Sequence, residues 1–166
     1  MNMFNKEKMK ELIHYIIAKC NYRSSFGRTV LYKLLYFSDF NFYEMYEKSI
    51  TDEDYIRLDN GPVPKNFQIA KNDLVNERKI KEDKEIVIDY PKYSYISLKP
   101  PETNLLSLEE KSVIDSVIKK LSSMNAVNIS DYSHGDMPWR ATKDNEIINY
   151  EYVFYRDDKY SVREYK

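Results

Sequence analysis

The sequence predicts an α+β fold: a mostly helical single domain over residues 1–166, with a short antiparallel β-ribbon. Three observations predict this class. Two early segments carry apolar residues at helical spacing, a middle segment is rich in β-branched and aromatic residues, and an amphipathic helix follows it. A length of 166 residues suits one domain with a sizeable core.

Two helices are expected first. One apolar face recurs at three- and four-residue steps along Met9, Leu12, Ile13, Ile16, Ile17 and Cys20. We expect Cys20 to be a small core residue on this face and His14 to lie at its edge. The second helix, residues 28–46, is apolar on more than one face, which predicts a central position. Asp39 follows its apolar run, and base rates for carboxylates favour a solvated edge for that side chain.

A stiff corner is expected at residues 58–67, LDNGPVPKNF. Residues 55–58 are strand-like, and the dipeptide Asn60-Gly61 is typical of a turn. Two prolines stiffen the backbone after this turn, and Pro64 suits the first turn of the next helix. We interpret the stretch as a strand-to-helix corner. A phosphate loop would need more glycines and more free N–H groups.

The ribbon is expected between residues 79 and 100, with a turn near its middle. Its strands would contain Ile86, Val87, Ile88, Tyr93, Tyr95, Ile96 and Leu98. The acidic cluster Asp52, Glu53 and Asp54, which precedes the corner, is interpreted as a solvated loop.

The later helices carry recognisable caps. Ser107 and Glu110 match a capping box before an apolar face of Val113, Ile114, Val117, Ile118 and Leu121. Asn125 is expected to cap a shorter helix that Gly135 ends, and Pro138 to open a further turn. The aromatic and charged tail, from residue 149, fits a short helix or an edge strand.

Composition restricts the function classes. The chain has 26 basic and 27 acidic residues without a basic block, so we do not expect nucleic acid as a partner. One cysteine and two histidines cannot form an internal disulfide or a cysteine-rich zinc site. No signal peptide and no run of about 20 apolar residues is found, so we expect a cytoplasmic protein without a membrane partner.

A catalytic set is not recognisable. His134 lies near Asp131 and Asp136, but no nucleophile or second histidine accompanies it. A histidine at a helix end can instead bind carbonyl groups, and we favour that structural role. An enzyme that uses His134 with Asp59 or Asp136 stays open as an alternative, as does a DNA-binding regulator.

Three motifs in order carry a family resemblance. They are KLLYF at residues 33–37, the GPVP corner at residues 61–64, and a late pair of His134 with Pro138-Trp139. Together they resemble the Panacea domain, also called the SocA-like antitoxin domain, which occurs in phage-associated proteins. The resemblance extends from residue 28 to about residue 141.

The resemblance implies a small, mostly helical bacterial or phage protein that neutralises a toxin by direct binding. Such antitoxins are encoded beside their toxins in type II toxin–antitoxin systems, often of prophage origin, and some deliver the toxin to a protease. The family has no established catalytic residues or cofactors, so we expect no enzyme activity and no cofactor. We expect the partner to be a toxin from an adjacent gene. The expected contact residues are Tyr36, Asp59, Asn60, Val63, His134 and Trp139.

Overall fold

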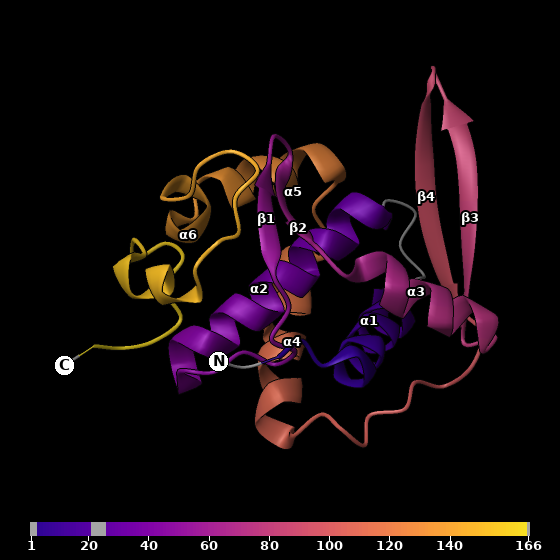
Figure 1. The fold of residues 1–166 in the computed structure, drawn as a ribbon, viewed down its shortest axis with the longest axis horizontal. Coiled ribbons are helices and arrows are strands. Elements are labelled where there is room, and N and C mark those ends of the chain that lie inside the picture. Colours follow the sequence, from indigo (N-terminus) through magenta and orange to yellow (C-terminus); the bar gives the residue numbers. More distant parts are fainter. Residues whose placement is uncertain (1–2, 21–25, 166) are drawn as a thin grey trace.

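The computed structural model, which describes residues 3–20 and 26–165, has the expected α+β architecture (Figure 1). Its helices are α1 (Lys6–Cys20), α2 (Arg28–Tyr46), α3 (Phe67–Asn76), α4 (Leu108–Leu121), α5 (Ala126–His134), α6 (Met137–Arg140) and the 3₁₀ helix η1 (Tyr150–Tyr155). Its strands are β1 (Tyr55–Leu58), β2 (Gly61–Pro64), β3 (Ile80–Val87) and β4 (Tyr90–Ser97).

Helix α2 is the centre of the fold. It packs against α1, α4, α5, β2, β4 and η1, and Figure 1 shows it crossing the middle of the molecule. Its apolar side chains, from Leu31 to Phe40, are almost completely buried. A helix that is apolar all round can be stable in water only under such cover. Cys20 on α1 is also buried, as predicted.

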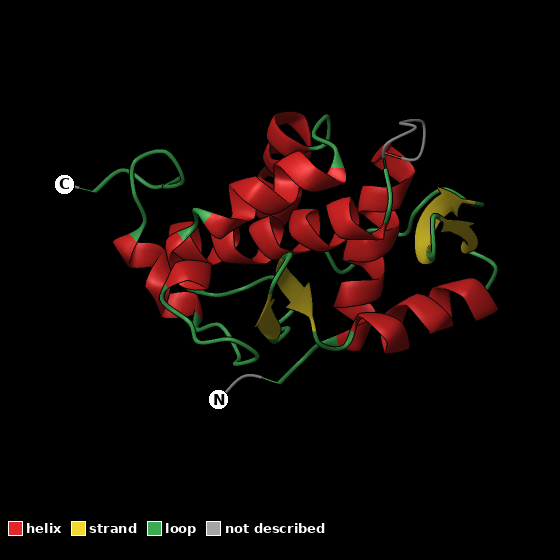
Figure 2. Cartoon of the chain, turned by 90° about the horizontal axis from the view of Figure 1, so that it is seen from above, coloured by secondary structure: helices red, strands yellow, loops and turns green. Residues whose placement is uncertain are grey.

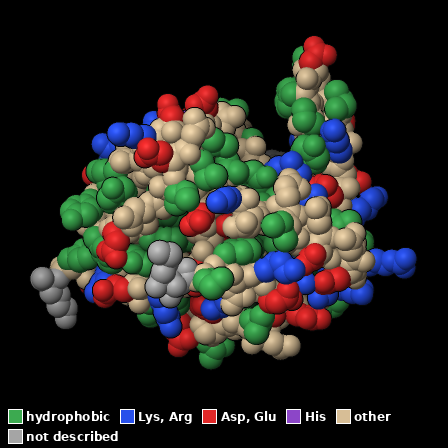
Figure 3. Space-filling model, in the orientation of Figure 1, with side chains coloured by type: hydrophobic (Ala, Val, Ile, Leu, Met, Phe, Trp, Pro, Cys, Tyr) green, Lys and Arg blue, Asp and Glu red, His purple; other side chains and the backbone are tan. Residues whose placement is uncertain are grey.

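Two separate antiparallel hairpins make up the strands (Figure 2). The β3–β4 ribbon confirms the predicted one, and it stands out from the body in Figures 1 and 3. Its boundaries differ at two positions. Ile88 lies in the turn with Asp89, both at positive φ, and Leu98 follows the end of β4. The tight turn therefore takes a residue that a propensity argument assigns to a strand.

The predicted corner at residues 58–67 is wrong in its second half, because residues 61–64 form strand β2 and pair with β1. Lys65 N–H donates to the Asp54 carbonyl, and hydrogen-bonded positions alternate along an antiparallel pair. Pro62 and Pro64 therefore occupy the positions whose N–H groups would point away from the partner strand. An edge strand accepts proline there. Helix α3 begins only at Phe67.

The predicted caps are confirmed. Ser107 Oγ accepts from Glu110 N–H while the Glu110 carboxylate accepts from Ser107 N–H, and Asn125 accepts from Asn128 N–H at the start of α5. Gly135 follows the end of α5. The tail forms one 3₁₀ helix, η1, that packs on α2.

Three polar side chains that were expected at the edge of an apolar face or in solvent are buried. His14 is 2% exposed, and its Nε2 donates to the Lys99 carbonyl at 3.1 Å; burial lowers its pKa. Asp39 and Glu53 are fully buried rather than solvated. Each of them accepts several hydrogen bonds from nearby backbone or side chains, which compensate the loss of water.

Candidate interaction site

The β1–β2 hairpin is held in place from several sides. Gly61 follows the turn residues Asp59 and Asn60 and has φ of +113°, a conformation that side chains disfavour. A Cβ at Gly61 would lie 2.6 Å from Lys33 Cε and in collision with Ser133 Oγ. Glycine therefore allows the hairpin to approach both α2 and α5.

Trp139 and His134 form hydrogen bonds with the backbone at the turn of this hairpin. Trp139 Nε1–H donates to the Leu58 carbonyl at 3.3 Å, and His134 Nε2 lies 2.8 Å from the Asp59 carbonyl oxygen. The two rings contact each other with centroids 4.5 Å apart. Because a carbonyl can only accept, His134 carries its proton on Nε2. The predicted residues His134, Trp139 and Asp59 thus meet at one place.

Arg57 packs against the indole ring of Trp139. Its guanidinium lies 3.8 Å from the centre of the indole ring. Its Nη1 donates to the carbonyls of Trp139 and Thr142, the second at 2.6 Å. Stacking and carbonyl contacts together fix the strand, the indole and the loop after α6 relative to one another.

A groove of about 490 Å³ lies between the hairpin and α2. Its wall is formed by Thr29, Tyr32, Lys33, Leu58, Asp59, Asn60, Val63, Asp144 and Asn145. Three of the six predicted contact residues, Asp59, Asn60 and Val63, line this groove. We call the surface formed by Leu58, Asp59, Asn60, Val63, His134 and Trp139 the hairpin face.

Tyr36 lies apart from the hairpin face. It is fully buried, and its hydroxyl donates to Asp136 Oδ2 at 2.8 Å. Asp136 directly precedes α6, the helix that carries Trp139. Tyr36 does not line the groove, and it supports the site from below.

Lys33 is the buried charge at the groove. It is 1% exposed, and its Nζ donates to the Pro62 carbonyl at 3.3 Å. Burial lowers the pKa of Lys33 from 10.5 to about 7. No carboxylate oxygen among the described residues lies within ion-pair distance of this amine.

Other buried charges have partners within the chain. Arg156 makes two hydrogen bonds of 2.8 Å to the Asp136 carboxylate and one of 3.0 Å to Glu44. The Asp39 carboxylate accepts from Ile50 N–H, from both Thr51 donors and from Tyr55 Oη–H. Burial raises the pKa of Asp39 to about 6 and that of Glu53 to about 7. These clusters hold the scaffold together.

The residues of the alternative acid–base hypothesis are otherwise engaged. Asp136 is bound by Arg156 and Tyr36 beneath the surface, and His134 contacts the backbone carbonyl of Asp59 rather than its carboxylate. The described residues bring no group of three His, Cys, Asp or Glu side chains together that could hold a metal ion.

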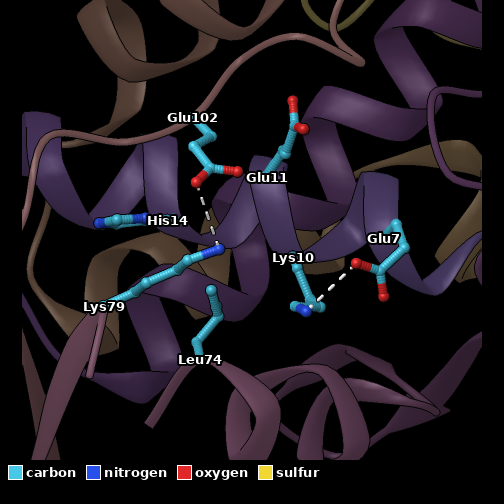
Figure 4. A pocket seen from close by; sticks show the side chains of 7 residues that line it. All are labelled: Glu7, Lys10, Glu11, His14, Leu74, Lys79 and Glu102. Carbon is cyan, nitrogen blue, oxygen red and sulfur yellow. Dashed lines mark hydrogen bonds and ion pairs between the residues drawn. The ribbon is translucent and has the colours of Figure 1, made fainter. Parts of the chain in front are cut away.

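A second, smaller hollow lies between α1 and the start of the ribbon (Figure 4). Its volume is about 30 Å³, room for about one water molecule. Lys10 pairs with Glu7, and Lys79 with Glu102, as the dashed lines show. Both of its lysines are paired and it has little room, so it is a weaker candidate than the groove.

Sequence reasoning missed Lys33, Arg57 and Arg156. A signal existed for Lys33, because a lysine in the middle of a helix that is apolar all round must be buried or reach the surface. Arg57 and Arg156 gave no signal, since their partners lie about 80 and 20 residues away along the chain.

Comparison with known families decides the identity. The sequence model of the family "Antitoxin SocA-like, Panacea domain" matches residues 31–140, about two thirds of the chain. The chain belongs to this family. The match covers α2 from residue 31 onward, both hairpins and the His134–Trp139 pair. No curated protein and no solved structure matches the chain.

SocA-like membership points to an antitoxin-like role with a protein partner, and so to a non-enzymatic one. Within the described ranges, none of the helices has the length and apolar character that a bilayer crossing requires. On the face shown in Figure 3, acidic and basic side chains are interspersed, unlike the basic footprint of a nucleic-acid-binding surface.

Proposed function

We propose that this protein is the antitoxin of a type II toxin–antitoxin system, and that it neutralises its toxin by direct binding through the hairpin face. The observation that carries the proposal is the coincidence of two facts. The chain belongs to the SocA-like family, and the predicted contact residues Asp59, Asn60 and Val63 line one groove, while His134 and Trp139 donate to the backbone of the same hairpin.

The hairpin face is suited to binding because its backbone is fixed before a partner arrives. Trp139, His134 and Arg57 each donate to backbone carbonyls of this region. A surface that is already ordered loses little conformational entropy on binding, which favours affinity. Trp and Arg also dominate binding energies at protein interfaces.

A growth-rescue assay tests the function. Each gene that flanks this one is induced in a heterologous bacterium with and without the protein, and the two products are then co-purified. A neighbour that stops growth alone, is harmless with this protein and co-elutes with it establishes the antitoxin. If a toxic neighbour is neither rescued nor bound, the proposal fails.

The same assay tests the surface. The variant Asp59→Ala/Asn60→Ala/His134→Ala is expected to lose rescue while it remains folded by circular dichroism. The matched control Asn72→Ala/Asp131→Ala changes two exposed residues outside the groove and is expected to rescue fully. Full rescue by the first variant would move the contact away from the hairpin face.

Two finer points have their own measurements. If the protein also delivers the toxin to a protease, the toxin itself is degraded. The amount of toxin that remains after translation is arrested measures this loss. A DNA-binding regulator requires a gel shift at low salt that weakens steeply as salt is added, and we expect none.

A further inference from the structure

Lys33 lacks a counter-ion within the described chain. An ammonium group has three N–H donors, and the Pro62 carbonyl accepts from Lys33 at 3.3 Å, longer than most such bonds. By contrast, the buried Lys71 Nζ lies 2.9 Å from the Glu82 carboxylate. Two lysines of similar burial thus differ in whether the fold supplies a negative charge.

The space around Lys33 is built from unusual residues. Gly61 takes a positive φ, and a methyl group in its place would press on Lys33 Cε at 2.6 Å. Glycine costs conformational entropy on folding, and a buried amine costs solvation. Both costs occur at the position where Lys33 lines the groove.

A buried amine without a counter-ion is restored to its charged form most simply by an incoming carboxylate. We propose that an acidic side chain of the bound toxin enters the groove between α2 and the hairpin and forms an ion pair with Lys33. This inference rests on the proposed function and names the chemistry of the partner's contact.

The rest of the groove defines the neighbours of that acid. Asp59 and Asn60 are exposed at the hairpin turn, and Asp144 lies 3.2 Å from Arg57 Nε. The two carboxylates oppose any further acid, and together with the Asn60 amide they accept from basic or amide side chains. Tyr32, Leu58 and Val63 supply apolar contact area. The fitting segment therefore has one acid among apolar, amide or basic residues. A polyphosphate does not fit, because both rim carboxylates would oppose it.

A peptide-display selection tests this chemistry without knowledge of the toxin. A library of random dodecapeptides is selected on the wild-type protein and on Lys33→Met, which keeps the length of the side chain and removes the charge. We expect wild-type-selected peptides to share one Asp or Glu and to bind Lys33→Met at least tenfold more weakly. Enriched peptides without a shared acid, equal binding to both proteins, or no enrichment would overturn the inference.

The control variant is Lys71→Met, which removes a buried lysine on α3 that pairs with Glu82 and does not line the groove. It is expected to bind the selected peptides as the wild type does. Thermal melting of each variant separates loss of binding from loss of fold.

The pH dependence of wild-type binding gives a second readout. Because the free amine is largely neutral above its pKa of about 7, ion-pair formation there takes up a proton. Affinity for the selected peptide should fall as pH rises from 7 to 9, by up to about tenfold per unit. The charged or titratable residues that line the groove with Lys33 are Tyr32 on α2, Asp59 on the hairpin and Asp144, and His134 on α5 contacts the Asp59 carbonyl. The variant His134→Gln removes any contribution of the histidine to the pH dependence of binding. An affinity that does not change between pH 7 and pH 9 contradicts the ion pair.

The outcomes distinguish the two proposals. If the wild-type protein rescues no toxic neighbour, the antitoxin function fails, whatever the peptides show. If both the wild type and Lys33→Met rescue growth and bind the toxin equally, the function holds and the Lys33 ion pair is wrong.

Discussion

Two buried charges on the same helix have opposite surroundings. Asp39, in the middle of α2, accepts four hydrogen bonds from within the chain, whereas Lys33, less than two turns earlier, donates to a single carbonyl among the described residues. Near the end of α2, Glu44 joins Arg156 and Asp136 in a closed cluster. The C-terminal half of α2 is thus scaffold, and its N-terminal half has a charge that the fold leaves uncompensated.

The largest expected effect tests the scaffold half. Arg156→Met leaves the carboxylates of Asp136 and Glu44 buried without their cation. Removal of one partner from a buried ion pair costs about 3–5 kcal/mol, and we expect a loss of that size in the free energy of unfolding. Urea denaturation measures it. Arg140→Met, which removes an exposed pair with Asp157, should cost less than about 1 kcal/mol. Equal losses of unfolding free energy in the two variants would contradict the difference between the buried and the exposed ion pair.

Asp39→Asn comes next in size. The amide replaces one acceptor oxygen by a donor that faces the N–H and O–H donors of Ile50, Thr51 and Tyr55. We expect a loss of about 1–3 kcal/mol in the free energy of unfolding. Asp131→Asn, at an exposed site on α5, is the control and should be near neutral.

The stability difference between the wild type and Asp39→Asn is expected to depend on pH. Burial raises the pKa of Asp39 from 3.8 to about 6, so the folded state favours the neutral acid. Its contribution to stability is complete below about pH 4 and is lost as pH rises through about 6. The difference in unfolding free energy between wild type and Asp39→Asn should therefore shrink over this range. A constant difference would mean that Asp39 stays ionised.

Gly61→Ala tests the contact between the hairpin and Lys33. The substitution forces a side chain into a positive φ and against Lys33 and Ser133. We expect a loss of about 1–2 kcal/mol in the free energy of unfolding. Asn60→Ala, one residue earlier and without a positive φ, is the matched control. A neutral Gly61→Ala would show that the hairpin can move away from α2.

Lys33→Met should have the smallest effect on stability and the most informative pH dependence. At pH 7 we expect the free energy of unfolding to change by less than about 1 kcal/mol, because a buried amine without a counter-ion is replaced by an apolar chain. In the wild type, the lowered pKa makes stability fall as pH drops from about 10 to about 7, and the Met variant lacks this slope. A large loss would show that Lys33 is a structural anchor.

Sequence reasoning predicted the parts of the fold that depend on near neighbours. The apolar faces of α1 and α4, the capping box of Ser107 and Glu110, and the β3–β4 ribbon all depend on residues within one turn or one hairpin of each other. Three motif residues, Val63, His134 and Trp139, lie at the hairpin face, whereas the motif residue Tyr36 is buried apart from it. The turns were harder to predict from the sequence. Ile88 lies in a turn although isoleucine favours strands, and Gly61–Pro64 form a strand although glycine and proline disfavour one.

The sequence alone therefore determined the α+β class, the helix faces and caps, and the family. The tertiary structure alone decided which charges are buried and which have partners. Asp39, Glu53 and Lys33 look alike in the sequence, as polar residues near apolar runs. Their surroundings depend on groups up to 29 residues away, and those of Asp136 and Tyr36 on a contact across 100 residues. Periodicity reports only local neighbours, so only the folded chain shows that Lys33 borders a groove and that no carboxylate of the described residues lies within ion-pair distance of its amine.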